Sequence, residues 1–292
     1  MQRINRAIDY VVANLDQPLS LDDVAKAASF SPFHFHRVFR SLLGETLHHF
    51  IKRVRLERAL TMLSRYPKPS LTEVGLACGL GSSSQFSRSF RQRFGVPPSA
   101  FDIDVFRQQR RDEWQRVAAG AEHRHLLEGL PPGSNPDNFA VVLRKLPART
   151  VAYVRVMDPY QPNRVVDAAA RMLAWARREG IADGQWLGYM WDDPDIVASK
   201  DCRYDIGLVV DSVRPTGEIG RIEFPAMTVA ALEIRGAIDL EVRALDWIFK
   251  TWLPQSGFVP SDQPSFEAWI GEPFAHGMEH FELEVQIPVV RG

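Results

Sequence analysis

Two short stretches place arginine next to aromatic, imidazole and small polar side chains at the spacing of an exposed helix face. The first set is Phe33, His36, Arg37 and Arg40, and the second is Ser83, Ser84, Gln85 and Arg88. Arginine can donate two parallel hydrogen bonds to guanine, and the other side chains can contact base edges or thymine methyl groups in the major groove. An ordinary charged surface is the alternative, but it gives no reason to expose Phe33. The two sets therefore predict contacts with double-stranded DNA.

A different chemistry is indicated closer to the C-terminus, where a carboxylate lies among aromatic residues. In the expected strand 266–270, alternation places Glu267 and Trp269 on one face and Phe266 on the other. A carboxylate in a dry pocket is costly unless it is paired, and an organic cation would supply both charge and a cation–π contact. The predicted ligand-binding residues are Glu267, Trp269, Tyr153, Tyr189 and Trp191. The alternative is that these rings form ordinary sheet core and that Glu267 pairs with an arginine of the same domain.

Each of the two DNA-contacting sets requires a helix that begins just before it, and the sequence shows both starts. Ser31 followed by Pro32 is typical of an N-cap and a first helical residue, and predicts a helix over 33–42. Ser82 is the predicted N-cap of the second helix, which ends at Gly95. A short apolar helix precedes each of them, so both stretches have the pattern of a helix-turn-helix.

The two helix-turn-helix patterns are copies of each other. When 24–44 is aligned with 74–95, with one added residue in the second turn, the same residue types recur at a spacing of 50 to 51. The matched positions include Val24 with Val74, Phe35 with Phe86, Arg37 with Arg88, Phe39 with Phe90 and Gly44 with Gly95. A long apolar-striped helix over 46–64 is expected to link the copies. Two such units could place basic helices in neighbouring major grooves, about 34 Å apart.

Charge divides the chain at a similar point. Residues 1–111 hold 17 Lys and Arg against 9 Asp and Glu, whereas residues 112–292 hold 18 against 27. A basic module that binds a polyanion, joined to a separate acidic module, would give this division. The first ten residues include charged side chains and no apolar signal core, and no run reaches the roughly 18 apolar residues of a membrane-spanning helix. We therefore expect a soluble cytoplasmic protein that is nucleoid-associated when it binds DNA.

Cysteine and histidine spacings indicate neither a metal site nor a cofactor. Two cysteines, Cys78 and Cys202, cannot build a disulfide framework, and Cys78 falls in an apolar helical pattern. The histidine pairs are His34 with His36, His48 with His49, and His276 with His280. The first two pairs have the wrong spacing to share a helix face, and Gly277 argues against a helix that would align the third.

The acidic part contains a second duplication. A cluster of Pro, Gly, Ser and Asn predicts a linker at 109–138, between a first domain at 1–108 and a second at 139–292. Within the second domain, 146–152 recurs as 224–230, and each copy leads into a strand, an amphipathic helix and two more strands. Tandem β-α-β-β units predict antiparallel-rich sheets with helices on one side and a cleft where the halves meet. The expected fold class is multidomain, with an all-α double helix-turn-helix domain followed by an α+β domain.

The run 19–101 closely resembles the DNA-binding domain of AraC-family transcription regulators, especially the MarA and Rob kind. The resemblance rests on SLDDVAKAASFSPFHFHRVFR, on the helix RVRLERALTML and on the closing ACGLGSSSQFSRSFRQRFGVPPSAF. It implies that the first helix reads bases through Phe33, His36 and Arg37, and the second through Ser83, Ser84, Gln85 and Arg88. Predicted phosphate contacts, which set register without reading sequence, are Arg40, Arg53, Arg91 and Arg93. The departures from the family pattern fall in the reading positions, so no operator sequence follows.

The second domain resembles the GyrI-like small-molecule-binding domain found in Rob and in multidrug-responsive regulators. The resemblance rests on VAYVRVMDPY, GYMWDDP, WLPQSGF, PSFEAW and FELEVQIPV, in that order. It implies that Glu267 contributes to an amphipathic, often cationic, ligand site with aromatic residues around it. Met157 and Asp158 stand where the family tends to have a glycine, so the shape of the loop at Tyr160 does not carry over.

The combined expectation is a one-component transcription regulator that binds promoter DNA and senses a small amphipathic, cationic or aromatic effector. The effector would change DNA affinity or contact with RNA polymerase, and a monomer or weak dimer is expected because one chain carries both readers. The alternative is a hydrolase of small electrophiles, with Glu267 as base and Tyr153 or Tyr189 as acid. No nucleophile with a paired base is evident in the sequence, so an enzyme is not expected.

Overall fold

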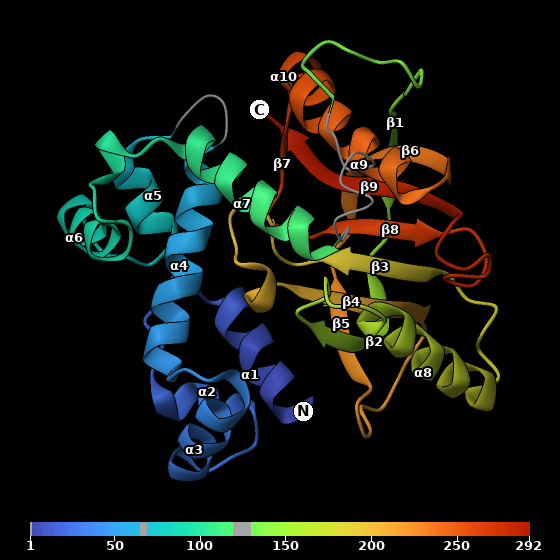
Figure 1. Cartoon of the computed structure of the whole chain (residues 1–292). Coiled ribbons are helices and arrows are strands. Elements are labelled where there is room, and N and C mark those ends of the chain that lie inside the picture. Colours follow the sequence, from blue (N-terminus) through green and yellow to red (C-terminus); the bar gives the residue numbers. More distant parts are fainter. Residues whose placement is uncertain (1, 65–68, 119–129) are drawn as a thin grey trace. The chain divides into compact units, whose positions relative to one another are not determined.

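The computed structural model describes residues 2–64, 69–118 and 130–292, and it divides into two compact units, Met1–Gln109 and Arg110–Gly292 (Figure 1). Part of the predicted linker, 119–129, lies outside the described residues. Before that gap the chain is helical up to Ala118, and after it Leu130 already packs into the core of the second unit.

The first unit is built from helices whose starts follow the capping residues in the sequence. Its elements are α1 (Gln2–Ala13), α2 (Leu21–Ala27), α3 (Pro32–Leu43), α4 (Leu47–Leu63), α5 (Leu71–Ala77), α6 (Ser83–Phe94), η1 (Pro98–Ala100) and the beginning of α7 (Ile103–Ala118). The hydroxyl groups of Ser20, Thr46, Ser70 and Ser82 accept N-capping hydrogen bonds, and Ser70 completes a capping box with Glu73. The predicted N-cap at Ser82 is confirmed, and α3 begins at Pro32 as expected, although Ser31 makes no side-chain capping hydrogen bond.

The two helix-turn-helix pairs, α2 with α3 and α5 with α6, have matching cores. Phe35 and Phe39 of α3 and Phe86 and Phe90 of α6 are fully buried, which confirms the duplication at the level of packing. In the second turn, Gly79 has a φ of +64°, and a Cβ there would lie 2.2 Å from the carbonyl oxygen of Leu15. Backbone conformation and close approach therefore both require glycine at this position.

Helix α4 links the two pairs as expected. Phe50 and Val54 pack with the core of α1, α2 and α3, and the later turns of α4 contact α5. At the end of α3, helical spacing from Phe35 and Phe39 would place Leu42 on the core face, but Leu42 is 46% exposed and the following residue, Leu43, packs against the core instead.

The second unit has a single nine-stranded antiparallel sheet. Its strands are β1 (Val142–Leu146), β2 (Arg149–Met157), β3 (Trp186–Met190), β4 (Arg203–Val210), β5 (Gly220–Phe224), β6 (Met227–Gly236), β7 (Phe258–Pro260), β8 (Ser265–Trp269) and β9 (Phe281–Arg291). Its helices are α8 (Arg164–Glu179), η3 (Ser199–Asp201), α9 (Ile238–Trp247), the π-helical turn η4 (Ile248–Trp252) and α10 (Leu253–Ser256). The strand order is β1-β6-β9-β8-β3-β4-β2-β5, with β7 beside β9.

The two repeats meet at the pairing of β3 with β8, in the middle of this sheet. The strand that leads each repeat lies beside the other repeat, because β1 pairs with β6 and β5 pairs with β2. Helix α8 packs on β2 and β4, α9 packs on β6 and β9, and both share one apolar core, so they cover the same face of the sheet. The predicted β-α-β-β duplication is confirmed, with one continuous sheet in place of separate sheets.

Candidate functional site

The predicted DNA-contacting residues of α3 lie on its exposed side. Phe33 is 75% exposed, and His36, Arg37 and Arg40 are exposed as well. The Arg37 guanidinium carbon lies 5.9 Å from the centroid of the Phe33 ring, so the two side chains form one surface. The core phenylalanines occupy the opposite side of the helix. Helix α3 can therefore offer a guanidinium, an imidazole and an aromatic ring to a groove.

Helix α6 offers a smaller and more polar surface. Ser84, Gln85 and Arg88 are exposed, whereas Ser83 is half-buried. The Gln85 side chain lies over the turn before the helix, since a Cβ added at Gly81 would fall 2.0 Å from the Gln85 Oε1 atom. The surface that α6 can present to DNA thus consists mainly of Ser84, Gln85 and Arg88.

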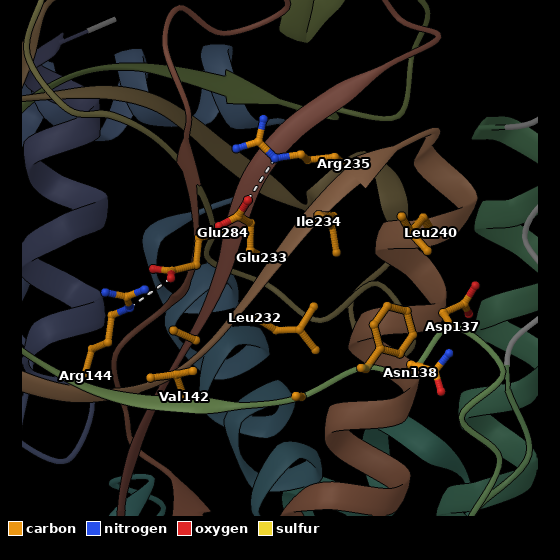
Figure 2. A pocket seen from close by; sticks show the side chains of 13 residues that line it. Asp137, Asn138, Val142, Arg144, Leu232, Glu233, Ile234, Arg235, Leu240 and Glu284 are labelled. Atoms are coloured by element: carbon orange, nitrogen blue, oxygen red, sulfur yellow. Dashed lines mark hydrogen bonds and ion pairs between the residues drawn. The ribbon is translucent and has the colours of Figure 1, made fainter.

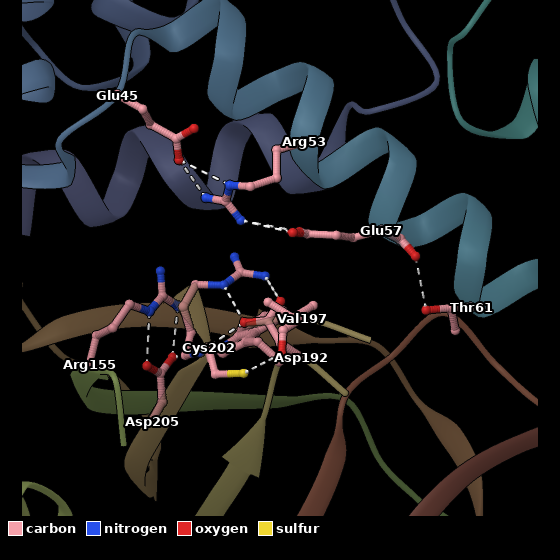
Figure 3. A network of polar contacts seen from close by, with 11 residues as sticks. Glu45, Arg53, Glu57, Thr61, Arg155, Asp192, Val197, Cys202 and Asp205 are labelled. Carbon is pink, nitrogen blue, oxygen red and sulfur yellow. Dashed lines mark hydrogen bonds and ion pairs between the residues drawn. The ribbon is translucent and has the colours of Figure 1, made fainter. Parts of the chain in front are cut away.

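One predicted phosphate contact is wrong. The Arg53 side chain is only 15% exposed, and it donates from Nη2 to Glu45 at 2.6 Å and from Nη1 to Glu57 at 3.1 Å (Figure 3). Its guanidinium is therefore committed to two carboxylates within the first unit. Arg40 and Arg91, by contrast, are exposed.

In the second unit, Glu267 lies on the helix-covered face of the sheet, within a closed group of polar and aromatic side chains. The Tyr204 hydroxyl of β4 donates to Glu267 Oε2, and the carboxyl of Glu241 on α9 hydrogen-bonds with that of Glu267. Trp269, two residues along β8, belongs to the same core face. These four residues are 5–7% exposed, so the site is filled by its own side chains.

Burial controls the protonation of this group. It raises the pKa of Glu267 to about 7, and the hydrogen bonds with Tyr204 and Glu241 lower that pKa only in part. Burial also raises the pKa of Glu241 well above its usual range, and the charge of Glu267 raises it further. Two carboxyl groups in such contact titrate as a pair and retain a proton at neutral pH. The arrangement can exchange that proton for one bound cation.

The room for the Glu267 carboxyl comes from a glycine directly across the sheet. Gly188 of β3 is the register partner of Glu267, and a Cβ there would lie 2.5 Å from Glu267 Oε2 and 1.9 Å from the Tyr204 hydroxyl. The two positions are also equivalent in the repeats. Gly188 pairs with Ile206 of β4, and Glu267 pairs with Val285 of β9. Strand β4 then pairs with β2 in the same register as β9 pairs with β6. The junction of the repeats therefore carries one carboxyl and one glycine.

Three of the predicted ligand-binding residues are not brought to Glu267. Tyr153 and Tyr189 belong to a second core cluster, with Phe266 and Phe224, and Trp191 packs against that cluster. Because Phe266 and Glu267 are adjacent on β8, this cluster lies on the opposite face of the sheet. The structure thus groups Glu267 with Trp269 and separates it from Tyr153, Tyr189 and Trp191.

The aromatic residues of this second face surround a cation that the protein itself supplies. The guanidinium carbon of Arg155 lies 5.0 Å from the Tyr153 ring centroid and 5.4 Å from that of Trp191. Arg155 also forms two hydrogen bonds to Asp205, at 2.9 and 2.7 Å (Figure 3). The Trp191 indole donates to the same carboxylate. Tyr153, Tyr189 and Trp191 therefore form part of the ordinary core of the sheet, which is the alternative considered from the sequence.

An open pocket of about 390 Å³ lies elsewhere, next to the part of β6 that extends beyond its pairing with β1. Leu232, Ile234 and Leu240 line it, and Figure 2 shows the Arg144–Glu284 pair among its charged side chains. Side chains of both charges line this pocket, and Glu267 is not among them, so the pocket is distinct from the site of the carboxyl pair. We therefore base the ligand site on Glu267.

Two residues of the site, Tyr204 and Glu241, were not predicted, although each left a signal in the sequence. Tyr204 alternates with Ile206 and Leu208 and therefore faces the same core. Glu241 precedes Ala244 and Ile248 at helical spacing, so a carboxyl lies on the buried stripe of α9. A charged residue on such a stripe indicates a partner inside the domain.

Within the described part of the chain, no group of three or more His, Cys, Asp or Glu residues is arranged to hold a metal ion. A search of the same residues for a helix long and apolar enough to cross a membrane found none.

Comparison with known proteins agrees with the division of the chain into two units. Residues 139–290 match the GyrI-like small molecule binding domain, and residues 24–102 match a helix-turn-helix domain. A DNA gyrase inhibitor of Serratia proteamaculans is 31% identical over 150 residues, which are 50% of this chain and 94% of that protein. The regulatory protein SoxS of Salmonella typhimurium is 33% identical over 100 residues, which are 34% of this chain and 92% of SoxS.

A third relative covers both units. The HTH-type transcriptional regulator YbfP of Bacillus subtilis is 29% identical over 221 residues, which are 69% of this chain and 70% of YbfP. The double helix-turn-helix, the duplicated sheet domain and these matches lead to one conclusion. The chain belongs to the GyrI-like family, and it is an AraC-type DNA-binding transcription regulator in which a GyrI-like domain follows the helix-turn-helix region.

Proposed function

We propose that this regulator reads operator DNA with α3 and α6 and senses a small amphipathic cation at the Glu267 site. The DNA-binding part, 1–108, would use Phe33, His36 and Arg37 on one helix and Arg88 on the other. The effector part, 139–292, would bind its ligand against Glu267, Glu241, Tyr204 and Trp269. The observation that supports the ligand class is a buried carboxyl pair beside an indole and a phenol, with no arginine or lysine bonded to it among the described contacts.

The DNA part of the proposal is supported by side chains that the fold leaves exposed. Arg88 of α6 corresponds to Arg37 of α3 in the duplication, and both are exposed on the second helix of a helix-turn-helix. A recognition helix contacts base edges from such positions, whereas arginines nearer the helix end contact phosphates. Arg91, exposed in the last turn of α6, is a matched candidate for a phosphate contact.

Mobility shift with a duplex selected from a random pool, and with a scrambled duplex, separates these roles. Arg88→Ala is expected to lower affinity for the selected duplex by about 1–3 kcal/mol and to reduce the ratio between the two duplexes. Arg91→Ala should weaken both duplexes about equally and make the salt dependence less steep. An unchanged ratio in Arg88→Ala would remove Arg88 as a base reader.

The ligand part is tested with a matched pair of small molecules. Benzyltrimethylammonium carries a quaternary cation on an aromatic ring, and neopentylbenzene has the same shape without the charge. Titration calorimetry is expected to show preference for the cation in the wild-type chain, because the cation pairs with the carboxylate and contacts the aromatic rings. Glu267→Gln should lose about tenfold in cation affinity, and Glu279→Gln, on an exposed loop, should not. Equal affinities in both variants would exclude the site.

A further inference from the structure

Helix α7 is a continuous helix that begins in the first unit and ends in the second, where it carries an arginine held by two buried carboxylates. Arg111 donates from Nη2 to Asp195 at 2.7 Å and from Nη1 to Asp246 at 3.1 Å. Asp195 and Asp246 are 5% and 6% exposed in their side chains, and Lys250 also pairs with Asp246, at 2.9 Å. Fork geometry toward two carboxylates makes this a strong and directional contact.

The other end of the same helix is part of the core that supports α6. Ile103 is buried, and the Phe106 ring lies 5.8 Å from that of Phe94 and 5.3 Å from that of Phe101, centroid to centroid. Phe94 is the last residue of α6. A change in the order or direction of α7 would therefore reach the base of the second reading helix.

Asp246 is located on α9, the helix that also carries Glu241. The Glu241 carboxyl hydrogen-bonds with Glu267 inside the closed site, and Asp246 follows only five positions later on the same helix. A ligand that reaches Glu267 has to displace a side chain that covers it, because no side chain of the site is more than 7% exposed, and Glu241 of α9 is one of the three that contact or flank it. A packed helix moves as a body, and α9 runs directly into the π-helical turn η4, a geometry often found at functional positions.

We propose that Arg111 couples occupancy of the Glu267 site to the DNA-binding unit. With the site closed, the Arg111 contacts hold α7 to α9 and to the loop that carries Asp195. Ligand entry moves α9, weakens the contact of Arg111 with Asp246, and changes how α7 supports α6. The ligand half of this coupling rests on the proposed function, whereas the contacts of Arg111 do not. Since coupling between two sites is reciprocal, DNA binding must in turn change the affinity of the Glu267 site, and in this proposal it does so through α9.

The test can therefore begin from the DNA side and needs no ligand. Hydrogen exchange of the full chain is measured with and without the selected duplex. In the wild type, DNA is expected to change the exchange rate of α9 by several-fold. Arg111→Gln should abolish that change, and Arg111→Lys should retain part of it. Arg116→Gln should retain all of it, because Arg116 is exposed and donates to the Asp112 carbonyl of the same helix. An unaltered α9 in the wild type, or a full response in Arg111→Gln, overturns the proposal.

Folding and ligand identity are controlled separately. Tryptophan fluorescence reports whether each variant keeps the second unit folded, and Asp246→Asn provides a second way to break the contact if Arg111→Gln does not fold. Benzyltrimethylammonium is then added to the DNA titration. If α9 responds to DNA but the cation does not bind, the proposed ligand is wrong and the Arg111 coupling stands. If the cation binds and shifts DNA affinity equally in the wild type and in Arg111→Gln, the coupling is wrong.

Discussion

Raising the pH from 5 to 8 is expected to destabilise the second unit, because it ionises a buried carboxyl pair. The pKa of Glu267 is about 7 in the folded protein, against an ordinary value of 4.5. The folded state therefore binds the proton more tightly than the unfolded chain. The resulting stabilisation is fully present below the ordinary value and is lost as pH rises through 7. At about 1.4 kcal/mol per pH unit, the loss from Glu267 alone is about 3 kcal/mol.

Urea denaturation followed by tryptophan fluorescence measures this loss, because all seven tryptophans lie between residues 112 and 292. The free energy of unfolding should fall from pH 5 to pH 8 in the wild type and in the exposed control Glu279→Gln. The double variant Glu241→Gln, Glu267→Gln leaves no ionisable carboxyl in the pair, so its profile should be flat. A flat wild-type profile, or the same fall in the double variant, would refute the assignment of the pair.

Three further perturbations follow from close contacts. Gly188→Ala should destabilise the second unit by about 1–3 kcal/mol, since its methyl group collides with the Tyr204 hydroxyl, and it should weaken cation binding in calorimetry. Gly79→Ala, at φ +64° and against the Leu15 carbonyl, should lower the melting temperature of the first unit in circular dichroism, and an unchanged melting temperature would contradict the turn geometry. Arg53→Met should cost about 1–3 kcal/mol by removing the ion pairs with Glu45 and Glu57, yet leave the salt slope of DNA binding unchanged.

The first unit could be predicted almost entirely from its sequence because local signals decide its structure. Ser82 caps α6 at the expected residue, and Phe35 and Phe86 occupy the same place in two copies of one motif. Each of these signals acts within a few residues along the chain. Arg53 departs from its expected role although both of its partners are local: Glu57 follows at i+4 on α4, and Glu45 lies in the loop just before that helix.

The ligand site was only half predictable, because a sheet decides which side chains meet through register between distant strands. Alternation within β8 placed Glu267 and Trp269 on one face correctly. Nothing in β3 alone reveals that Tyr189 pairs with Phe266, and is therefore turned away from Glu267. That pairing joins residues 77 positions apart. The sequence alone grouped Tyr153, Tyr189 and Trp191 with Glu267 because residue types do not indicate which face of the sheet each side chain occupies.

The meeting of Gly188 and Glu267 at the junction of the repeats has a consequence for symmetry. A side chain on a two-fold axis faces its own counterpart, so two identical repeats would present the same residue twice. Two copies of the first repeat would bring two glycines together and leave no charge. Two copies of the second would crowd two carboxyls into the space of one. A singly charged binding site at this position requires unequal halves, and a single chain that contains both repeats allows each half to diverge.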